Sequence, residues 1–375
     1  MNQTYIFEKT NKRGLNEDDV VNLLNSKREE VNQLMEIANH KRESNIITYS
    51  KNMFIPVTEI CRNACGYCIF KKSPANPDAI ILKDKKDIIV KLKESEKYGC
   101  KEALLTFGEE ADSDKVVQKE LKKKGYVSIV EYVYDICENI LNETELLPHT
   151  NGGVFEYEDL KALHEVNVSM GMMIENSSER LMHTIAHENS PGKDPGLRLE
   201  AIANAGKLKI PYTTGILIGI GETKEEIAKS LMDIQKLQNK YGHIQELIVQ
   251  NFRSKKGTPM ENYPEPSLLD MIRTVSVSKL LFNDLSIQVP PNLNYETNQV
   301  FLLCGGDDWG GISPLTKDYV NPEASWPQIK QLKLLTNECG YEFKERLAIY
   351  DKYINSNYLN DNLLNKTLKM RNKLR

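Results

Sequence analysis

Three cysteines crowd into eight residues of this 375-residue chain. Cys61, Cys65 and Cys68 follow the spacing C-x3-C-x2-C, and no fourth cysteine lies close by in the sequence. Three thiolates can bind three irons of a [4Fe–4S] cube, which leaves the fourth iron without a protein ligand. A metal with an open coordination position suits chemistry, whereas a closed four-ligand site suits a structural role. The segment therefore predicts a reactive iron–sulfur centre.

This motif indicates radical chemistry on S-adenosylmethionine (SAM). In proteins with the motif, the open iron chelates the amino and carboxylate groups of SAM, and an electron from the cluster yields a 5′-deoxyadenosyl radical. Tyr67, just before the last cysteine, is expected to shield the cluster and pack beside adenine. The alternative is a zinc knuckle completed by a distant His or Cys. It is the weaker interpretation, because zinc sites usually pair two cysteine hairpins and this chain has one.

Short apolar runs between helix-length stretches predict the elements that position this centre. We expect strands at residues 53–58, 102–107, 145–150, 168–174, 213–220, 246–252, 285–290 and 300–304, the last two being the weakest. Strands that alternate with helices favour an α/β fold of parallel βαβ units. We expect a TIM-barrel-like fold with a (β/α)6 core extended to (β/α)8. Residues 1–50 are expected to form a helical extension whose first helix Asn16 caps, 51–326 the barrel, and 327–375 a helical tail packed on it.

In such a barrel, functional side chains follow the carboxyl ends of the strands. Glu109 follows the second expected strand and is a candidate acceptor for the methionine ammonium of SAM. Glu175 ends the fourth strand, where its carboxylate could accept both ribose hydroxyls. Gly219, Ile220 and Gly221 follow the fifth strand, where the glycines would let a ligand lie on bare backbone.

Each of these residues has a simpler alternative. A glutamate at a strand end often caps a helix, and the pair Gly219 and Gly221 is also typical of a tight turn without the dinucleotide fingerprint. Arg198, expected near the start of the helix before the fifth strand, could pair with the methionine carboxylate or lie on the surface. The functional interpretation is favoured because these residues share one predicted face with the cysteine motif.

Longer stretches of the chain resemble one family. FIPVTEICRNACGYCIF, HTNGG, PYTTGILIGIGET and DDWGGISPLTKDYVNPEASWP are similar to subunit 1 (CofG) of the synthases of 7,8-didemethyl-8-hydroxy-5-deazariboflavin (FO), over roughly residues 50–350. The resemblance implies a radical SAM barrel in which Cys61, Cys65 and Cys68 hold the [4Fe–4S] cluster. Glu109, Glu175 and Arg198 would contact SAM.

The resemblance also implies a reaction and partners. A separate radical enzyme, CofH, would join a 4-hydroxybenzyl group to 5-amino-6-(D-ribitylamino)uracil. The present chain would convert that adduct to FO by hydrogen abstraction, ring closure and loss of ammonia, with a low-potential electron donor for the cluster. His149 and Asp307 are the candidate proton-transfer residues. His149 could equally be a satisfied core residue.

The overall composition limits the alternatives. Lys and Arg number 49 against 53 Asp and Glu, a net charge of −4, which gives no electrostatic footprint for nucleic acid or an anionic membrane. No apolar run approaches the roughly 18 residues of a membrane span. The N-terminus lacks the apolar segment of a secretory signal, so we expect a cytoplasmic protein. The open alternatives are another radical SAM enzyme (CofH, a menaquinone-pathway or a hydrogenase-maturase type) and a non-catalytic iron–sulfur or zinc protein.

Overall fold

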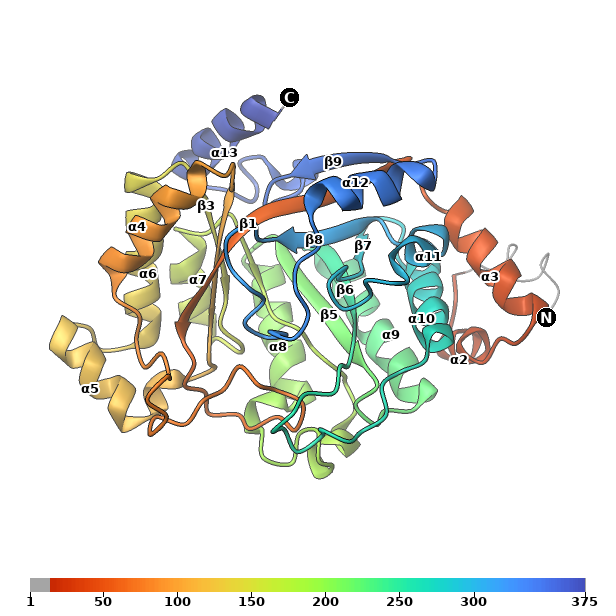
Figure 1. Ribbon diagram of the computed structural model, residues 1–375, viewed down its shortest axis with the longest axis horizontal. Helices are drawn as coiled ribbons and strands as arrows, with labels where there is room; N and C mark the ends of the chain where they lie inside the picture. Colours follow the sequence, from red (N-terminus) through yellow and green to blue (C-terminus); the bar gives the residue numbers. More distant parts are fainter. Residues whose placement is uncertain (1–13, 375) are drawn as a thin grey trace.

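A computed structural model describes residues 14–374 and shows a closed parallel barrel (Figure 1). Its strands are β1 (Ile46–Thr58), β2 (Glu102–Phe107), β3 (Leu147–Asn151), β4 (Ser169–Gly171), β5 (Tyr212–Ile218), β6 (Ile244–Asn251), β7 (Ser286–Gln288) and β8 (Asp308–Ile312). They lie side by side in chain order, and β1 closes the ring by pairing with both β2 and β8. The expected α/β barrel with eight strands is therefore confirmed.

Helices surround the barrel (Figure 1). They are α2 (Glu17–Leu24), α3 (Glu29–His40), α4 (Lys85–Glu96), α5 (Lys115–Lys124), α6 (Ile129–Glu143), α7 (Tyr157–His164), α8 (Pro195–Lys207), α9 (Lys224–Tyr241), α10 (Leu268–Leu281), α11 (Asn298–Leu303), α12 (Ile329–Glu338) and α13 (Asp361–Leu374). Asn16 caps α2 as expected, in a reciprocal capping box with Asp19. Residues 1–13 of the expected helical extension lie outside the described residues.

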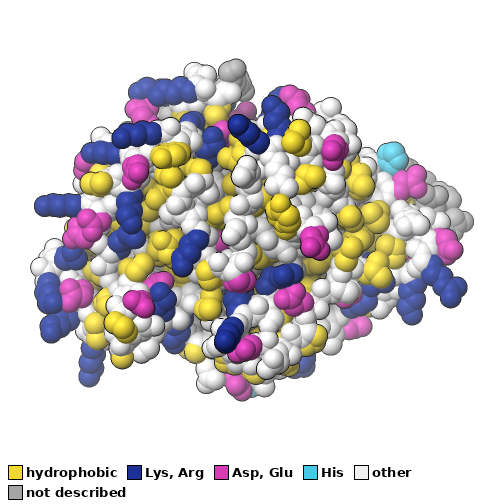
Figure 2. All heavy atoms as spheres, in the orientation of Figure 1, with side chains coloured by type: hydrophobic (Ala, Val, Ile, Leu, Met, Phe, Trp, Pro, Cys, Tyr) yellow, Lys and Arg dark blue, Asp and Glu magenta, His cyan; other side chains and the backbone are white. Residues whose placement is uncertain are grey.

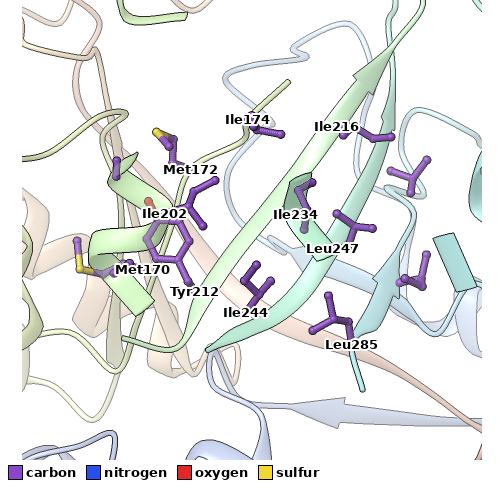
Figure 3. Close-up of a cluster of buried hydrophobic side chains, with 14 of the residues drawn as sticks. Met170, Met172, Ile174, Ile202, Tyr212, Ile216, Ile234, Ile244, Leu247 and Leu285 are labelled. Carbon is purple, nitrogen blue, oxygen red and sulfur yellow. The ribbon is translucent and has the colours of Figure 1, made fainter. Parts of the chain in front are cut away.

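The apolar core lies between the strands and the helices outside them. Figure 3 shows Met170, Tyr212 and Leu247, from β4, β5 and β6, grouped with Ile202 of α8 and Ile234 of α9. Because side chains alternate along a strand, the residues between these apolar ones point into the barrel. Those inward residues are largely polar, and they shape the cavity described below.

The surface carries both signs of charge. On the face shown in Figure 2, Lys and Arg side chains gather over α4, α5 and α13, with Asp and Glu between them. Among residues 14–374, no helix is long and apolar enough to cross a membrane.

A ninth strand corrects the expected helical tail. β9 (Glu342–Arg346) pairs in parallel with Ile46–Ser50 of β1, whereas β2 pairs with β1 only from Asn52 onward. β1 therefore begins inside the region expected to be a helical extension. Beyond β9 the chain passes beneath the barrel, where the Ala348 carbonyl accepts hydrogen bonds from Ser169 Oγ (2.7 Å) and Gln245 Nε2 (3.1 Å). This segment closes the amino end of the barrel.

The expected eighth strand was wrong. Residues 300–304 lie in and just after α11, where Phe301 and Leu302 are buried while Leu303 is 43% exposed. A short apolar run alone does not distinguish a helix from a strand. The true β8, DWGGI, contains two glycines, which have low strand propensity, so the sequence gives it little signal.

Candidate active site

One cavity of about 340 Å³ occupies the barrel interior. At the carboxyl ends of the strands it is lined by Cys61, Cys65 and Cys68, and at the closed end by Arg346 and Ala348. Inward-facing residues of the barrel strands form its walls. The cavity therefore connects the cysteine loop to the segment that closes the barrel.

The cysteine loop is held by the backbone of two other segments. The Ala64 and Gly66 amides donate to the carbonyls of Asn189 and Ala186, each at 2.9 Å, and the Met260 amide donates to the Gly66 carbonyl at 2.9 Å. Gly108, at the end of β2, lies so close that a Cβ there would be 1.9 Å from the Ile60 carbonyl oxygen. Only glycine allows this contact, which fixes the loop against β2.

Three thiols, of Cys61, Cys65 and Cys68, lie on the wall of the cavity. All three are free. Backbone amides direct hydrogen bonds to two of the sulfurs, from Asn63 to Cys61 and from Phe70 and Lys71 to Cys68. Such bonds stabilise cluster-bound thiolates. Burial raises the pKa of the Cys61 thiol to about 11, so its deprotonation is coupled to iron binding.

Glu109 and Arg198 come together as a buried pair. Arg198 Nη2 donates to Glu109 Oε2 at 3.0 Å, and both side chains are only 3% exposed. Arg198 Nε and Nη1 donate to the carbonyls of Gly192 and Met173. All three guanidinium nitrogens of Arg198 thus donate to protein acceptors, and the side chain holds Glu109 in place. In this geometry the guanidinium is not free to bind the carboxylate of SAM through two parallel hydrogen bonds.

Glu175 adopts a left-handed backbone conformation, with φ of 64°. Its amide donates to the Gly215 carbonyl (3.2 Å) and its carbonyl accepts from the Leu217 amide (2.9 Å), so β5 holds it there. Its Oε1 accepts from Lys193 Nζ at 2.6 Å, with both side chains 11% exposed. A non-glycine residue in this conformation costs energy and is typical of functional sites.

Tyr67 contacts the cavity, whereas the segment of Gly219, Ile220 and Gly221 does not. Tyr67 lines it, and its hydroxyl hydrogen-bonds His187 Nε2 at 3.1 Å. Ile220 packs in the same apolar cluster as Tyr67. The amides of Gly219 and Ile220 donate to the Glu222 carboxylate at 2.7 and 2.8 Å, and Gly219 and Gly221 line a separate pocket. The structure therefore does not place the backbone of Gly219, Ile220 and Gly221 where a ligand in the barrel cavity could lie on it.

His149 points into the cavity from β3 with a defined tautomer. Ser169 Oγ gives its single proton to the Ala348 carbonyl (2.7 Å), so at the 2.7 Å contact with His149 Nδ1 it must accept. Nδ1 therefore carries the proton, and Nε2 has no hydrogen-bond partner within residues 14–374. Burial, reinforced by the charge of Arg346, lowers the pKa of His149 to about 3. The ring is neutral, with its basic nitrogen free.

A charged cluster forms the closed end of the cavity. Arg346 donates to Glu246 Oε1 (2.6 Å) and to both carboxylate oxygens of Asp308 (2.6 and 2.9 Å). With its amide nitrogen facing Glu246, Gln288 donates to both oxygens of that carboxylate (2.9 and 3.2 Å). Burial is the main cause that raises the pKa of Glu246, with Asp308 adding to it and Arg346 opposing it.

Comparison with known proteins identifies the family. The model of the radical SAM superfamily matches residues 55–234. The chain is 62% identical over 326 residues to 7,8-didemethyl-8-hydroxy-5-deazariboflavin synthase of Methanobrevibacter smithii, covering 86% of this chain and 96% of that protein. The synthase of Methanocaldococcus jannaschii is 54% identical over 359 residues, covering 95% and 98%.

The chain belongs to the FO synthase family.

Solved structures support the fold. The [FeFe]-hydrogenase maturase HydG superposes with a TM-score of 0.75 at 18% identity, covering 91% of this chain and 76% of that one. Methylornithine synthase (PylB) superposes with a TM-score of 0.69 at 19% identity, covering 90% and 96%. At these identities the likeness extends to the fold alone, so the hydrogenase-maturase alternative is not favoured over FO synthase.

Asp307 does not belong to the site of this FO synthase family member. It immediately precedes β8, at the amino end of the barrel, and does not line the cavity. Arg42 Nη1 and Lys279 Nζ each contact its carboxylate at 2.8 Å. The structure therefore gives no support to the catalytic prediction for Asp307, which assumed that the eighth strand ends before this residue.

Sequence reasoning missed Lys193, Glu102, Glu246 and Arg346. Lys193 ends a short 3-10 helix (Pro191–Lys193), and Arg346 ends a strand that was expected to be helix. Glu102 and Glu246 are single acidic residues inside apolar runs, EALLTF and ELIVQNF. Their positions within expected strands were the available signal, since a buried carboxylate in a strand needs a specific reason.

Proposed function

We propose that this protein converts 5-amino-5-(4-hydroxybenzyl)-6-(D-ribitylimino)-5,6-dihydrouracil to FO with release of ammonia, as a carbon–nitrogen lyase. The observation that carries the proposal is the continuity of one cavity from the three free cysteines to a polar barrel interior. The family relationship supports the product. The adduct combines a phenol, a pyrimidine and a polyol, which suits a cavity with aromatic walls and polar groups.

The cysteine end is assigned to radical formation. Cys61, Cys65 and Cys68 would hold a [4Fe–4S] cluster, which together with SAM would supply a 5′-deoxyadenosyl radical for hydrogen abstraction. Glu109, fixed by Arg198, and the Glu175–Lys193 pair are the charged groups beside this end. We assign them to binding the polar parts of SAM, and Tyr67 to packing against its base.

The overall conversion removes two hydrogens and ammonia from the adduct. One hydrogen atom leaves to the deoxyadenosyl radical. The second leaves as a proton and an electron when the ribityl-bearing nitrogen bonds to the phenol ring, and the oxidised cluster would take up that electron. We assign that proton to His149, because it lines the cavity and its Nε2 lone pair is not used by the hydrogen bond to Ser169. The buried Nδ1 bond to Ser169 keeps the ring oriented.

Two partners follow from this chemistry. The adduct must come from a second enzyme, and the related family assigns that step to a separate radical enzyme, CofH. The cluster must also receive an electron from a low-potential donor before SAM is cleaved. We propose that both the second enzyme and the electron donor deliver to the cysteine end of the cavity, because the segment after β9 closes the other end.

The test is an anaerobic assay of the reconstituted holoenzyme with reductant, SAM and the synthetic adduct. Mass spectrometry should detect 5′-deoxyadenosine, ammonia and FO in equal amounts, with FO also seen by fluorescence. Deoxyadenosine without FO would reject the substrate and retain radical chemistry. The absence of both products from protein with an intact cluster would reject the proposed function.

A further inference from the structure

The closed end of this barrel is unusually polar. Barrel interiors are commonly filled by branched apolar residues. Here the inward positions nearest the closed end carry polar side chains, namely Ser50, Asn52, Glu102, His149, Thr213, Glu246 and Gln288. Further toward the cysteines, the lining includes Phe54, Phe107, Leu217 and Phe252. The lining is therefore polar at the closed end and mixed toward the cysteines, where aromatic side chains stand beside polar ones such as Gln250 and Asn251.

Hydrogen-bond acceptors exceed donors at the closed end. Glu102 Oε2 accepts from Ser50 Oγ at 2.5 Å, while Glu102 Oε1 has no hydrogen-bond partner within residues 14–374. Asn52, the register partner of Glu102 on β1, has its Oδ1 buried without a partner among the same residues. His149 Nε2 is a third unpaired acceptor. Arg346, the guanidinium closest to this group, is already engaged by Glu246 and Asp308.

Unpaired buried acceptors are costly, and a ligand rich in donors relieves the cost. Burial raises the pKa of Glu102, because little solvent reaches this carboxylate. The part of the adduct with the most donors per unit length is its ribityl chain. Its hydroxyls form charge-assisted bonds with carboxylates, which are stronger than neutral ones.

On the basis of the proposed function, we infer that the closed end of the barrel is the ribityl site, with Glu102 and Asn52 accepting hydrogen bonds from the chain hydroxyls. We name this set, Asn52, Glu102 and Glu246, the ribityl floor. The opposite orientation would bury the phenol among charged groups, away from the aromatic side chains of Phe54 and Phe107. The ribityl chain thus fixes the depth at which both rings lie below the cysteines.

This orientation also explains the place of His149. On β2 and β3, Glu102 pairs with Leu147 while Leu104 pairs with His149, so His149 lies one inward position closer to the cysteines than Glu102. The ribityl-bearing nitrogen forms the new ring bond in FO. A chain bound on the ribityl floor places that nitrogen beside the free Nε2 of His149.

A binding comparison on the anaerobic holoenzyme tests the inference. The probes are FO and an FO analogue with a methyl group in place of the ribityl chain, each titrated by its deazaflavin fluorescence. Wild type should bind FO at least about tenfold more tightly than the analogue, since a hydrogen bond to a charged group contributes that much. Glu102→Gln should reduce this ratio several-fold while leaving the affinity for the methyl analogue unchanged.

The matched control is Glu345→Gln. Glu345 precedes Arg346 on β9 but contacts Lys51 and Tyr49 outside the cavity, so the FO preference should be retained. Should Glu102→Gln not fold, Glu102→Asp keeps the charge but withdraws the acceptor, and it should also lower the ratio.

The outcomes separate the two proposals. Equal wild-type affinity for FO and the methyl analogue overturns the ribityl floor, even if the enzyme makes FO. An unchanged preference in folded Glu102 variants overturns it as well. Failure of the turnover assay rejects the proposed function independently, because the probe ratio is measured without catalysis. In assays with the adduct, Glu102→Gln should raise KM with little change in kcat, which loss of structure alone would not produce.

Discussion

The two ends of the barrel cavity are built in different ways. At the cysteine end, three residues within one eight-residue loop carry the chemistry, and backbone contacts hold that loop in place. At the closed end, single side chains or pairs come from six different strands, and Arg346 comes from β9, nearly three hundred positions beyond Ser50. The comparison teaches that radical generation resides in a contiguous motif, whereas substrate recognition resides in the alternation of separate strands.

The largest expected effect comes from a replacement that stops radical formation at the cysteine end and leaves FO binding at the closed end. Cys65→Ala should abolish formation of 5′-deoxyadenosine, because the cluster loses one of its three protein ligands. Affinity for FO should change less than about twofold if the closed end binds independently, since distant sites are usually additive. Iron content, product chromatography and FO titration give the three readouts. Cys339→Ala, a half-buried cysteine outside the cavity, should leave all three unchanged.

The difference between the ends also explains what the sequence could predict. The motif and seven of the eight barrel strands were readable because apolar runs and cysteine spacing are local signals. β9, EFKER, was missed because it is charged and only half-buried. Its register depends on pairing with β1 across the whole chain.

A small error in the predicted position of the eighth strand changed which residue was assigned to the site. The eighth strand was predicted at 300–304 instead of 308–312, so Asp307 appeared to follow it rather than precede it. Neighbouring residues of a strand point to opposite faces. Asp307 therefore meets Arg42 and Lys279 at the barrel end, whereas Asp308 meets Arg346 in the network below the cavity. The sequence contains no local feature that distinguishes these two aspartates.

His149 lies between the two ends of the cavity. Its replacement should lower the formation of FO without stopping the formation of 5′-deoxyadenosine. His149→Gln should lower FO formation by about 10²- to 10⁴-fold, the range for loss of a general base. Formation of 5′-deoxyadenosine should persist, because the cysteine end is intact. Both products are quantified in single turnover. Equal losses of FO and deoxyadenosine would contradict the assignment of His149 to proton transfer after hydrogen abstraction.

Arg198 offers a test of how the cysteine end is supported. Arg198→Met leaves the buried Glu109 carboxylate with only the partly exposed Arg62 as charge partner (3.2 Å), and loss of a buried partner typically costs about 3–5 kcal/mol of stability. Urea unfolding measures this loss. The double variant Arg198→Met, Glu109→Gln should recover part of it by removing the poorly compensated charge. If the second replacement gave no recovery, the pair would not be coupled as the 3.0 Å contact indicates.

The smallest expected effect is an acid sensitivity that His149 contributes from the boundary between the ends. Its pKa is about 3 when folded, below the ordinary value of 6.5, so the unfolded chain takes up the proton first as pH falls. This contribution to stability is complete above about pH 6.5 and is lost progressively toward pH 3. Between pH 7 and pH 5.5, wild type should lose about 1 kcal/mol more than His149→Gln in urea unfolding. An identical pH response of wild type and His149→Gln would show that the ring is not held neutral, and would remove the basis for its free Nε2 as a proton acceptor.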